Sequence, residues 1–154
     1  MNRKTILATL AGLFIGAAVC FAADPNIGTW KLNEAKSKIA PGAGHNNTVV
    51  YEGAGDIMKA TVDGVLADGT PAHNEWTGRF DGKDYAVEGD PNSDMRAYKK
   101  INARTVELTV KKGGKVTTTG RIVLAADGKS RTLTTTATDP AGKKVTSTAV
   151  YDKQ

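Results

Sequence analysis

The sequence predicts an all-β protein, a single antiparallel meander β-barrel of about ten strands. Turn signals made of Gly, Asp, Asn and Pro recur about every ten residues from Tyr51 to the C-terminus. These residues supply the backbone angles that tight hairpins need. The segments between the turns are rich in Thr, Val, Ile and Tyr, which favour strands. No linker separates two patterned halves, so residues 23–154 are expected to form one domain.

Each expected strand lies between two of these turns, and only one short segment suits a helix. Asn33 is placed to cap a single helical turn over 34–38, and Pro41 and Gly42 stop that turn from continuing. The strands are expected at 29–33, 48–52, 57–65, 72–80, 84–88, 95–101, 105–111, 116–124, 131–138 and 144–151.

An N-terminal segment, residues 1–22, is expected to be a secretory signal peptide. Arg3 and Lys4 precede a long apolar run, and small residues allow cleavage after Ala22. The run is shorter than the roughly 20 residues that a spanning helix needs. An alternative is a lipoprotein acylated on Cys20, but the bulky valine before it disfavours that processing. The mature chain is therefore expected to be periplasmic or secreted, without a membrane span.

The charge of the chain gives little support to a polyanionic partner. Loss of Arg3 and Lys4 with the leader lowers the formal net charge from +5 to +3. The densest basic pairs, Lys99-Lys100 and Lys111-Lys112, lie beside expected turns, where lysines discourage strand pairing between molecules. Binding to nucleic acid or to anionic lipid is therefore not expected. The single cysteine lies in the leader, so the domain has no disulfide and depends on its core.

Alternation within the strands predicts which side chains face the barrel interior. Val106, Leu108 and Val110 alternate with polar residues and mark the inner face of their strand. Most of the other inward positions hold small or polar residues, which favours either an open cavity or a flattened barrel whose walls meet. The other inward positions expected are Asn74, Trp76, Gly78, Phe80, Met95, Ala97, Ile101, Val116, Thr118, Gly120, Ile122, Leu124, Leu133, Thr135, Ala137, Val145, Ser147, Ala149 and Tyr151.

Both ends of the domain resemble the calycins. The opening segment 28–32, Gly-Thr-Trp-Lys-Leu, carries the Gly-x-Trp pattern of the lipocalins. Joined to the closing Val150-Tyr151, it is also similar to the intracellular fatty-acid-binding proteins, whose barrels have ten meandering strands. Over its full length the chain resembles small exported bacterial proteins of unassigned function that carry Phe-Asp-Gly-Lys-Asp-Tyr, here residues 80–85.

Trp30 is expected to be a structural plug at one end of the barrel. A large ring at the point where the chain enters fills that end, while its indole N–H can reach a backbone carbonyl. The resemblance to lipocalins implies a basic side chain over this ring. Arg121 and Arg131 are the two candidates, and both stay open from the sequence.

The resemblance to fatty-acid-binding proteins implies a ligand site that this chain changes. In that family an arginine two residues before the closing tyrosine helps to hold the ligand carboxylate, whereas Ala149 precedes Tyr151 here. Only residues 34–47 separate the first two strands, which leaves no room for the family's two-helix lid. A more open and more neutral pocket is expected. Its candidate ligand-binding residues are Asn74, Trp76, Thr118, Thr135, Ser147 and Tyr151.

No pattern of residues indicates an enzyme, a metal site or a cofactor. His45 and His73 are isolated and have no nucleophile or metal-ligand partner at a suitable spacing. The carboxylates over 81–94 lie near turns and fit no calcium-loop pattern. The sequence therefore predicts a non-enzymatic lipocalin-like protein that binds a small apolar or amphipathic ligand such as a lipid. The alternative is an envelope-associated interaction or inhibitor-like module that uses the barrel as a scaffold for protein binding.

Overall fold

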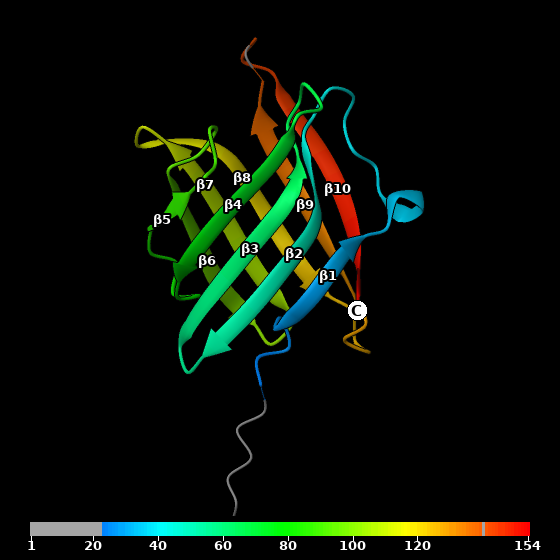
Figure 1. Cartoon of the computed structure of the whole chain (residues 1–154), viewed down its shortest axis with the longest axis vertical. Coiled ribbons are helices and arrows are strands. Elements are labelled where there is room, and N and C mark those ends of the chain that lie inside the picture. Colours follow the sequence, from blue (N-terminus) through cyan, green and yellow to red (C-terminus); the bar gives the residue numbers. More distant parts are fainter. Residues whose placement is uncertain (1–22, 140) are drawn as a thin grey trace, which may run out of the picture.

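The structure, a computed structural model, describes residues 23–139 and 141–154 and contains the expected ten-stranded antiparallel barrel (Figure 1). Each strand pairs with its neighbours in sequence, and the first strand pairs with the last, which closes the barrel. The predicted leader lies outside the described residues. The strands are β1 (Gly28–Leu32), β2 (His45–Ala54), β3 (Ile57–Val65), β4 (Pro71–Gly78), β5 (Tyr85–Glu88), β6 (Met95–Asn102), β7 (Thr105–Lys112), β8 (Lys115–Leu124), β9 (Ser130–Thr138) and β10 (Lys144–Lys153).

A single helical turn follows β1, as predicted. The 3-10 helix η1 (Glu34–Lys36) begins after Asn33, whose side-chain oxygen accepts a hydrogen bond from the backbone N–H of Lys36 at 3.2 Å. The chain then runs along β10, where the N–H of Lys38 donates to the carbonyl of Thr148 at 2.7 Å. This connection therefore lies against the barrel wall beside β10, and no two-helix lid stands between β1 and β2.

The two ends of the barrel are formed by different turns. In Figure 1 the chain enters β1 at the lower end, which also holds the turns β2–β3, β6–β7 and β8–β9. The turns β3–β4, β7–β8 and β9–β10 form the upper end.

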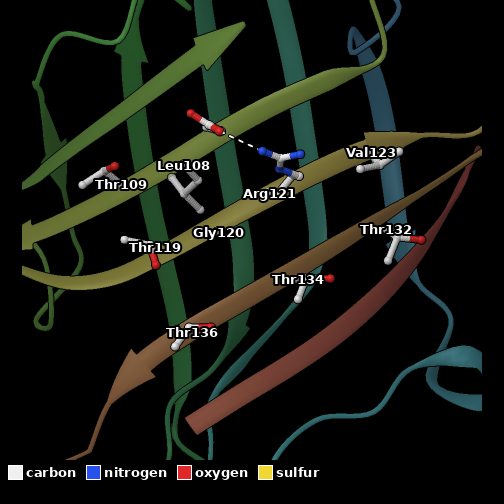
Figure 2. Close-up of a pocket in the computed structure, with 10 residues that line it drawn as sticks. Leu108, Thr109, Thr119, Gly120, Arg121, Val123, Thr132, Thr134 and Thr136 are labelled. Atoms are coloured by element: carbon white, nitrogen blue, oxygen red, sulfur yellow. Dashed lines mark hydrogen bonds and ion pairs between the residues drawn. The ribbon is translucent and has the colours of Figure 1, made fainter. Parts of the chain in front are cut away.

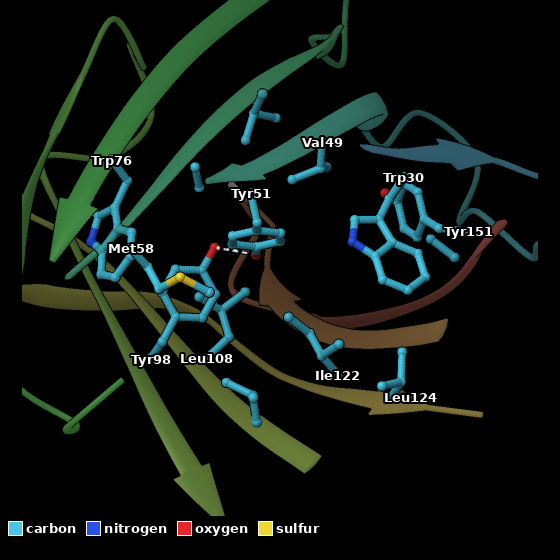
Figure 3. Packing of buried hydrophobic residues seen from close by; sticks show 14 of the residues in the cluster. Trp30, Val49, Tyr51, Met58, Trp76, Tyr98, Leu108, Ile122, Leu124 and Tyr151 are labelled. Carbon is cyan, nitrogen blue, oxygen red and sulfur yellow. Dashed lines mark hydrogen bonds between the residues drawn. The ribbon is translucent and has the colours of Figure 1, made fainter. Parts of the chain in front are cut away.

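Large buried side chains fill the interior, and Trp30, Tyr51, Tyr98 and Trp76 lie among them (Figure 3). Small side chains line the upper interior along β8, β9 and β10.

Alternation predicted the inner face of β7 and most of that of β8. Val106 and Leu108 are buried, as is Ile122 on β8. Val116, however, was expected inside and is 52% exposed. The register explains the error, because Val110 pairs with Thr118 while the next residue of β7 pairs with Val116. The intervening residue of β8 forms a bulge, which moves every residue before it to the opposite face.

The inner face of β6 was predicted wrongly. Met95 and Ile101 were expected inside but are exposed, whereas Arg96 and Tyr98 are buried. The pairing of β6 with β7 requires this arrangement, since Tyr98 lies opposite Leu108 and Arg96 opposite Val110, and opposite residues share a face of the sheet. Ala97, also expected inside, is buried although it pairs with outward-facing Thr109. The consequence for function is that an arginine enters the barrel from β6.

Candidate ligand-binding site in the barrel interior

Trp30 closes the lower end of the barrel, and two cations lie close to its ring. The ring is fully buried, and its Nε1–H donates to the carbonyl of Asn26 at 2.8 Å. The guanidinium carbon of Arg131 lies 4.7 Å from the ring centre, and the Nζ of Lys153 lies 5.1 Å from it. Of the two arginines considered for this position, Arg131 is therefore the one that covers Trp30. Arg121 lies on the outside of the barrel, where it pairs with a glutamate of β7.

Arg131 lies among three aromatic rings in the deepest part of the interior. Besides Trp30, the rings of Tyr51 and Tyr151 have their centres 4.9 and 5.3 Å from its guanidinium carbon. The residue is 3% exposed, and its Nε and Nη1 atoms have no hydrogen-bond partner. The lower end of the interior therefore holds a buried positive charge. A second inward arginine, Arg96, was missed because the inner face of β6 was assigned wrongly.

The middle of the barrel is filled by a cluster of aromatic side chains. The ring centres of Trp76 and Tyr98 are 4.7 Å apart, and those of Tyr51 and Tyr98 are 6.3 Å apart, both in edge-to-face arrangements (Figure 3). The Nε1–H of Trp76 donates to the backbone carbonyl of Arg96 at 3.0 Å. Trp76 is 1% exposed, so in this structure it belongs to the packed core.

Tyr151 also lies in the packed core, with its hydroxyl group turned upward to β2. That hydroxyl donates to the carbonyl of Asn46 at 3.1 Å. Burial raises the pKa of Tyr151 to about 12, although the nearby Arg131 acts in the opposite direction. Burial and the neighbouring Tyr98 raise the pKa of Tyr51 as well. Both phenols are therefore neutral at physiological pH.

Asn74 is bonded to the arginine that enters from β6. The Nη2 of Arg96 donates to Oδ1 of Asn74 at 3.2 Å and lies 3.6 Å from Oδ2 of Asp90. Asp90 also accepts hydrogen bonds from the backbone N–H of Asn92 and the hydroxyl of Ser93 in the loop before β6. Asn74 is thus inside the barrel, as predicted, but its carbonyl oxygen already has a partner.

The remaining three candidate residues lie higher in the barrel, where the interior is lined by small side chains. Thr135 pairs with Gly120 on one side and Ser147 on the other, and Thr118 pairs with Ala137. All five are only half-buried although they occupy inward positions. Gly120 also lines a concavity on the outer face, and the hydroxyl of Ser147 accepts a hydrogen bond from the backbone N–H of Ala40 at 3.0 Å. The structure therefore places Thr118, Thr135 and Ser147 together on inward positions at one level above the core.

A shallow concavity that the sequence did not suggest lies on the outside of β7, β8 and β9 (Figure 2). Its volume is about 600 Å³. Threonines at alternate positions make up half of the residues that line it, and the ion pair between Arg121 and Glu107 at 2.9 Å crosses it. The threonines are Thr109, Thr119, Thr132, Thr134 and Thr136. The alternate threonines of β9 are the feature of the sequence that could have indicated this outer face.

His73 lies on the outside of the barrel, whereas Nδ1 of His45 is buried without a hydrogen-bond partner. His73 contacts Asp63 through Nδ1 at 2.7 Å, and both are exposed. Asp81 accepts a hydrogen bond from the backbone N–H of Lys83, the local role expected of a turn aspartate. Within residues 23–139 and 141–154, no three His, Cys, Asp or Glu residues are grouped as metal ligands would be. The same residues include no helix with the length and apolar character needed to cross a bilayer.

Two solved structures are similar to this barrel. One is the structure of EF1p2_mFAP2b bound to DFHBI, with a TM-score of 0.51 and 11% sequence identity, covering 84% of this chain and 94% of that chain. The other is a redesigned β-barrel, mFAP1, bound to DFHBI, with a TM-score of 0.44 and 16% identity, covering 84% and 95%. No family model and no curated protein matches the chain. At this identity the first likeness shows a shared barrel fold and nothing further.

Proposed function

We propose that this protein is a non-enzymatic, ligand-binding barrel that takes up a small apolar or amphipathic molecule through its upper end. The supporting observation is the level of half-buried, inward-facing small residues above the aromatic core, formed by Thr118, Thr135 and Ser147 with their neighbours. Such a level offers apolar walls and a few convergent polar groups, the usual composition of a small-molecule site. A barrel of similar fold has been solved with a small molecule bound.

Nile red, a neutral apolar dye, tests this proposal. Its emission is expected to rise and shift to shorter wavelength with the folded protein, and to return to the free value when the protein is unfolded in urea. Thr135→Phe, which fills the interior level, should abolish the signal. Thr136→Phe, its outward-facing neighbour, is the matched control and should leave the signal unchanged. A signal that is lost with Thr136→Phe instead would locate the dye in the outer concavity.

We also propose that the protein is exported, on the basis of its N-terminal sequence. The basic residues Arg3 and Lys4, the apolar run and the small residues before Asp24 favour a leader that is removed. The domain would then work in the periplasm or outside the cell. Residues 23–154 contain no cysteine, so the domain would fold there without a disulfide.

The outer concavity favours a second candidate function, an interaction module. A protein partner could dock on the threonine-rich face of β7, β8 and β9, where the Arg121–Glu107 pair gives a polar anchor. Thr134→Arg would place a bulky charge in that face without reaching the interior. If partner binding is the function, this substitution should abolish it while leaving the binding of Nile red intact.

A further inference from the structure

The outer wall of the barrel over β7, β8 and β9 differs in composition from the opposite wall. Its central outward positions, named here the threonine face, hold only two ionisable side chains, one acid and one base. On the opposite wall, outward Lys59, Glu75 and Glu88 lie close together. Depletion of charged residues is typical of a surface that meets another protein. The threonine face consists of Thr105, Glu107, Thr109, Thr119, Arg121, Val123, Thr132, Thr134 and Thr136.

The two charges of the threonine face form a pair that a second copy of the chain can match. Glu107 and Arg121 lie directly opposite each other on β7 and β8, with an ion pair of 2.9 Å. The side chains keep 42% and 57% of their surface exposed, respectively, so both can contact a further partner. In an interface with two-fold symmetry the same surface is used twice. A two-fold axis that passes between them therefore places each charge over an opposite charge.

The shape of the wall leads to the same axis. A closed, twisted barrel has a hyperboloid wall, which is convex around the barrel and concave along it. The concavity of about 600 Å³ over β7, β8 and β9 agrees with this shape (Figure 2). Such a saddle fits a second copy of itself when the two-fold axis runs midway between the convex and concave directions. Strands tilted by about 40° to the barrel axis follow that direction closely, so an axis parallel to β7 and β8 satisfies both shape and charge.

We propose that the protein forms a two-fold symmetric dimer through the threonine face. The axis runs parallel to β7 and β8, and Arg121 of each copy lies over Glu107 of the second copy. The next pair along these strands, Thr109 and Thr119, is exchanged by the same axis, so threonine meets threonine there. The inference does not depend on ligand binding in the barrel interior. It gives the second candidate function a specific partner, another copy of this chain.

The extent of this contact sets the expected strength of the dimer. Beyond β7 and β8, the axis places β9 of one copy over β6 of the second copy, where Thr136 meets Ala97, the residue opposite Thr109. Val123, which is 44% exposed, is covered by Thr105. About a dozen side chains from each copy take part, fewer than the roughly 20–30 of a standard interface. The dimer should therefore be weak and dissociate on dilution.

Sedimentation velocity of the protein purified from its host tests for this dimer. The concentration is varied from about 1 µM to about 1 mM, a range that covers the dissociation constants expected of a small interface. The average mass should rise from that of one chain toward that of two chains. A protein that stays monomeric over the whole range would overturn the inference, while the binding of Nile red in the interior would be unaffected and the proposed function would stand.

Charge variants then locate the contact. Arg121→Glu leaves two acids on the threonine face and Glu107→Arg leaves two bases, so each variant alone should be monomeric because like charges meet across the axis. An equimolar mixture of the two should dimerise again, since opposite charges then face each other. Lys59→Glu makes the same change of charge as Arg121→Glu on the opposite wall, and as the matched control it should dimerise like the wild-type protein.

Three outcomes with these variants would contradict the threonine face as the contact. They are dimers that persist in both single variants, a mixture that stays monomeric, and a dimer that is lost equally in Lys59→Glu. Both charged side chains are well exposed, so the substitutions should leave the fold intact, and circular dichroism of each variant checks this.

Discussion

At the lower end of the barrel, one indole ring is enclosed by the two cations Arg131 and Lys153 and by a backbone carbonyl. Trp30→Ala should therefore be among the most damaging single substitutions, with a loss of about 3–5 kcal/mol in the free energy of unfolding. That is a large part of the total stability of a small domain. Urea unfolding followed by circular dichroism measures the loss. Trp30→Phe is the control and should cost clearly less, and an unchanged midpoint for Trp30→Ala would disprove the plug.

The raised pKa of the buried Tyr151 predicts that the protein loses stability at high pH. Its pKa is raised by burial from 10.0 to about 12, so the folded state holds the phenolic proton more tightly than the unfolded state. This contribution is fully present below pH 10 and is lost as the pH rises toward 12. The urea midpoint should accordingly fall over that interval. In Tyr151→Phe the fall should be less steep, although its midpoint at neutral pH should be lower because the bond to Asn46 is gone. Equal slopes for both proteins would contradict the assignment.

The sequence predicted inward side chains best where an apolar or aromatic residue also occupied an inward position of its strand. Trp30, Trp76 and Tyr151 were all placed inside from the sequence, and all are buried. Arginine gave no such signal, because an arginine is normally expected at the surface. The position of Arg131 could still have been inferred, since it alternates with Leu133 in the same strand, whereas Arg121 precedes the inward Ile122.

Among the elements, η1 offers a test of local structure. Oδ1 of Asn33 accepts from the N–H of Lys36, and its Nδ2 donates to Oδ2 of Asp152 on β10 at 2.6 Å. Asn33→Ala removes both bonds and should lower the free energy of unfolding by about 1 kcal/mol, the usual cost of losing such a cap. Glu34→Ala, in the same turn, should change stability by less than half as much. Thermal unfolding of the two variants side by side makes the comparison.

The number and order of the strands were predicted correctly, but the inner face of β6 and that of the first part of β8 were not. All ten expected segments form strands, because turn residues and β-favouring residues alternate so regularly along the chain. Apolar Met95 and Ile101 misled the assignment for β6, since the face of a strand is set by its register with a neighbour and not by its own apolar residues. The bulge in β8 that turns Val116 outward carries no sequence signal of its own.

For the whole molecule, the proposed export predicts the residue at which the mature chain begins. The protein purified from its host should begin at Ala23, with a mass that lacks residues 1–22 and hence Cys20. Small residues before the cleavage point and a short apolar run favour this processing. Intact-mass spectrometry gives the answer directly. A mass that retains Cys20 with an added lipid would instead indicate a lipoprotein held at a membrane surface.

Depth in the barrel separates the packed interior from the proposed ligand site. Ala149 lies in the buried core opposite Leu133, whereas Thr135 lies one inward position higher, between Gly120 and Ser147. Ala149→Phe should overpack the core and cost about 1–3 kcal/mol. Thr135→Phe should cost less, because Thr135 is only half-buried, and it should prevent Nile red from binding. Urea unfolding and dye titration of both variants supply the two measurements. Two results together would show that the upper interior is packed and would exclude the carrier function: Thr135→Phe as destabilising as Ala149→Phe, and no binding of Nile red to the wild-type protein. The outer face of β7, β8 and β9 would then be the site to test for a partner.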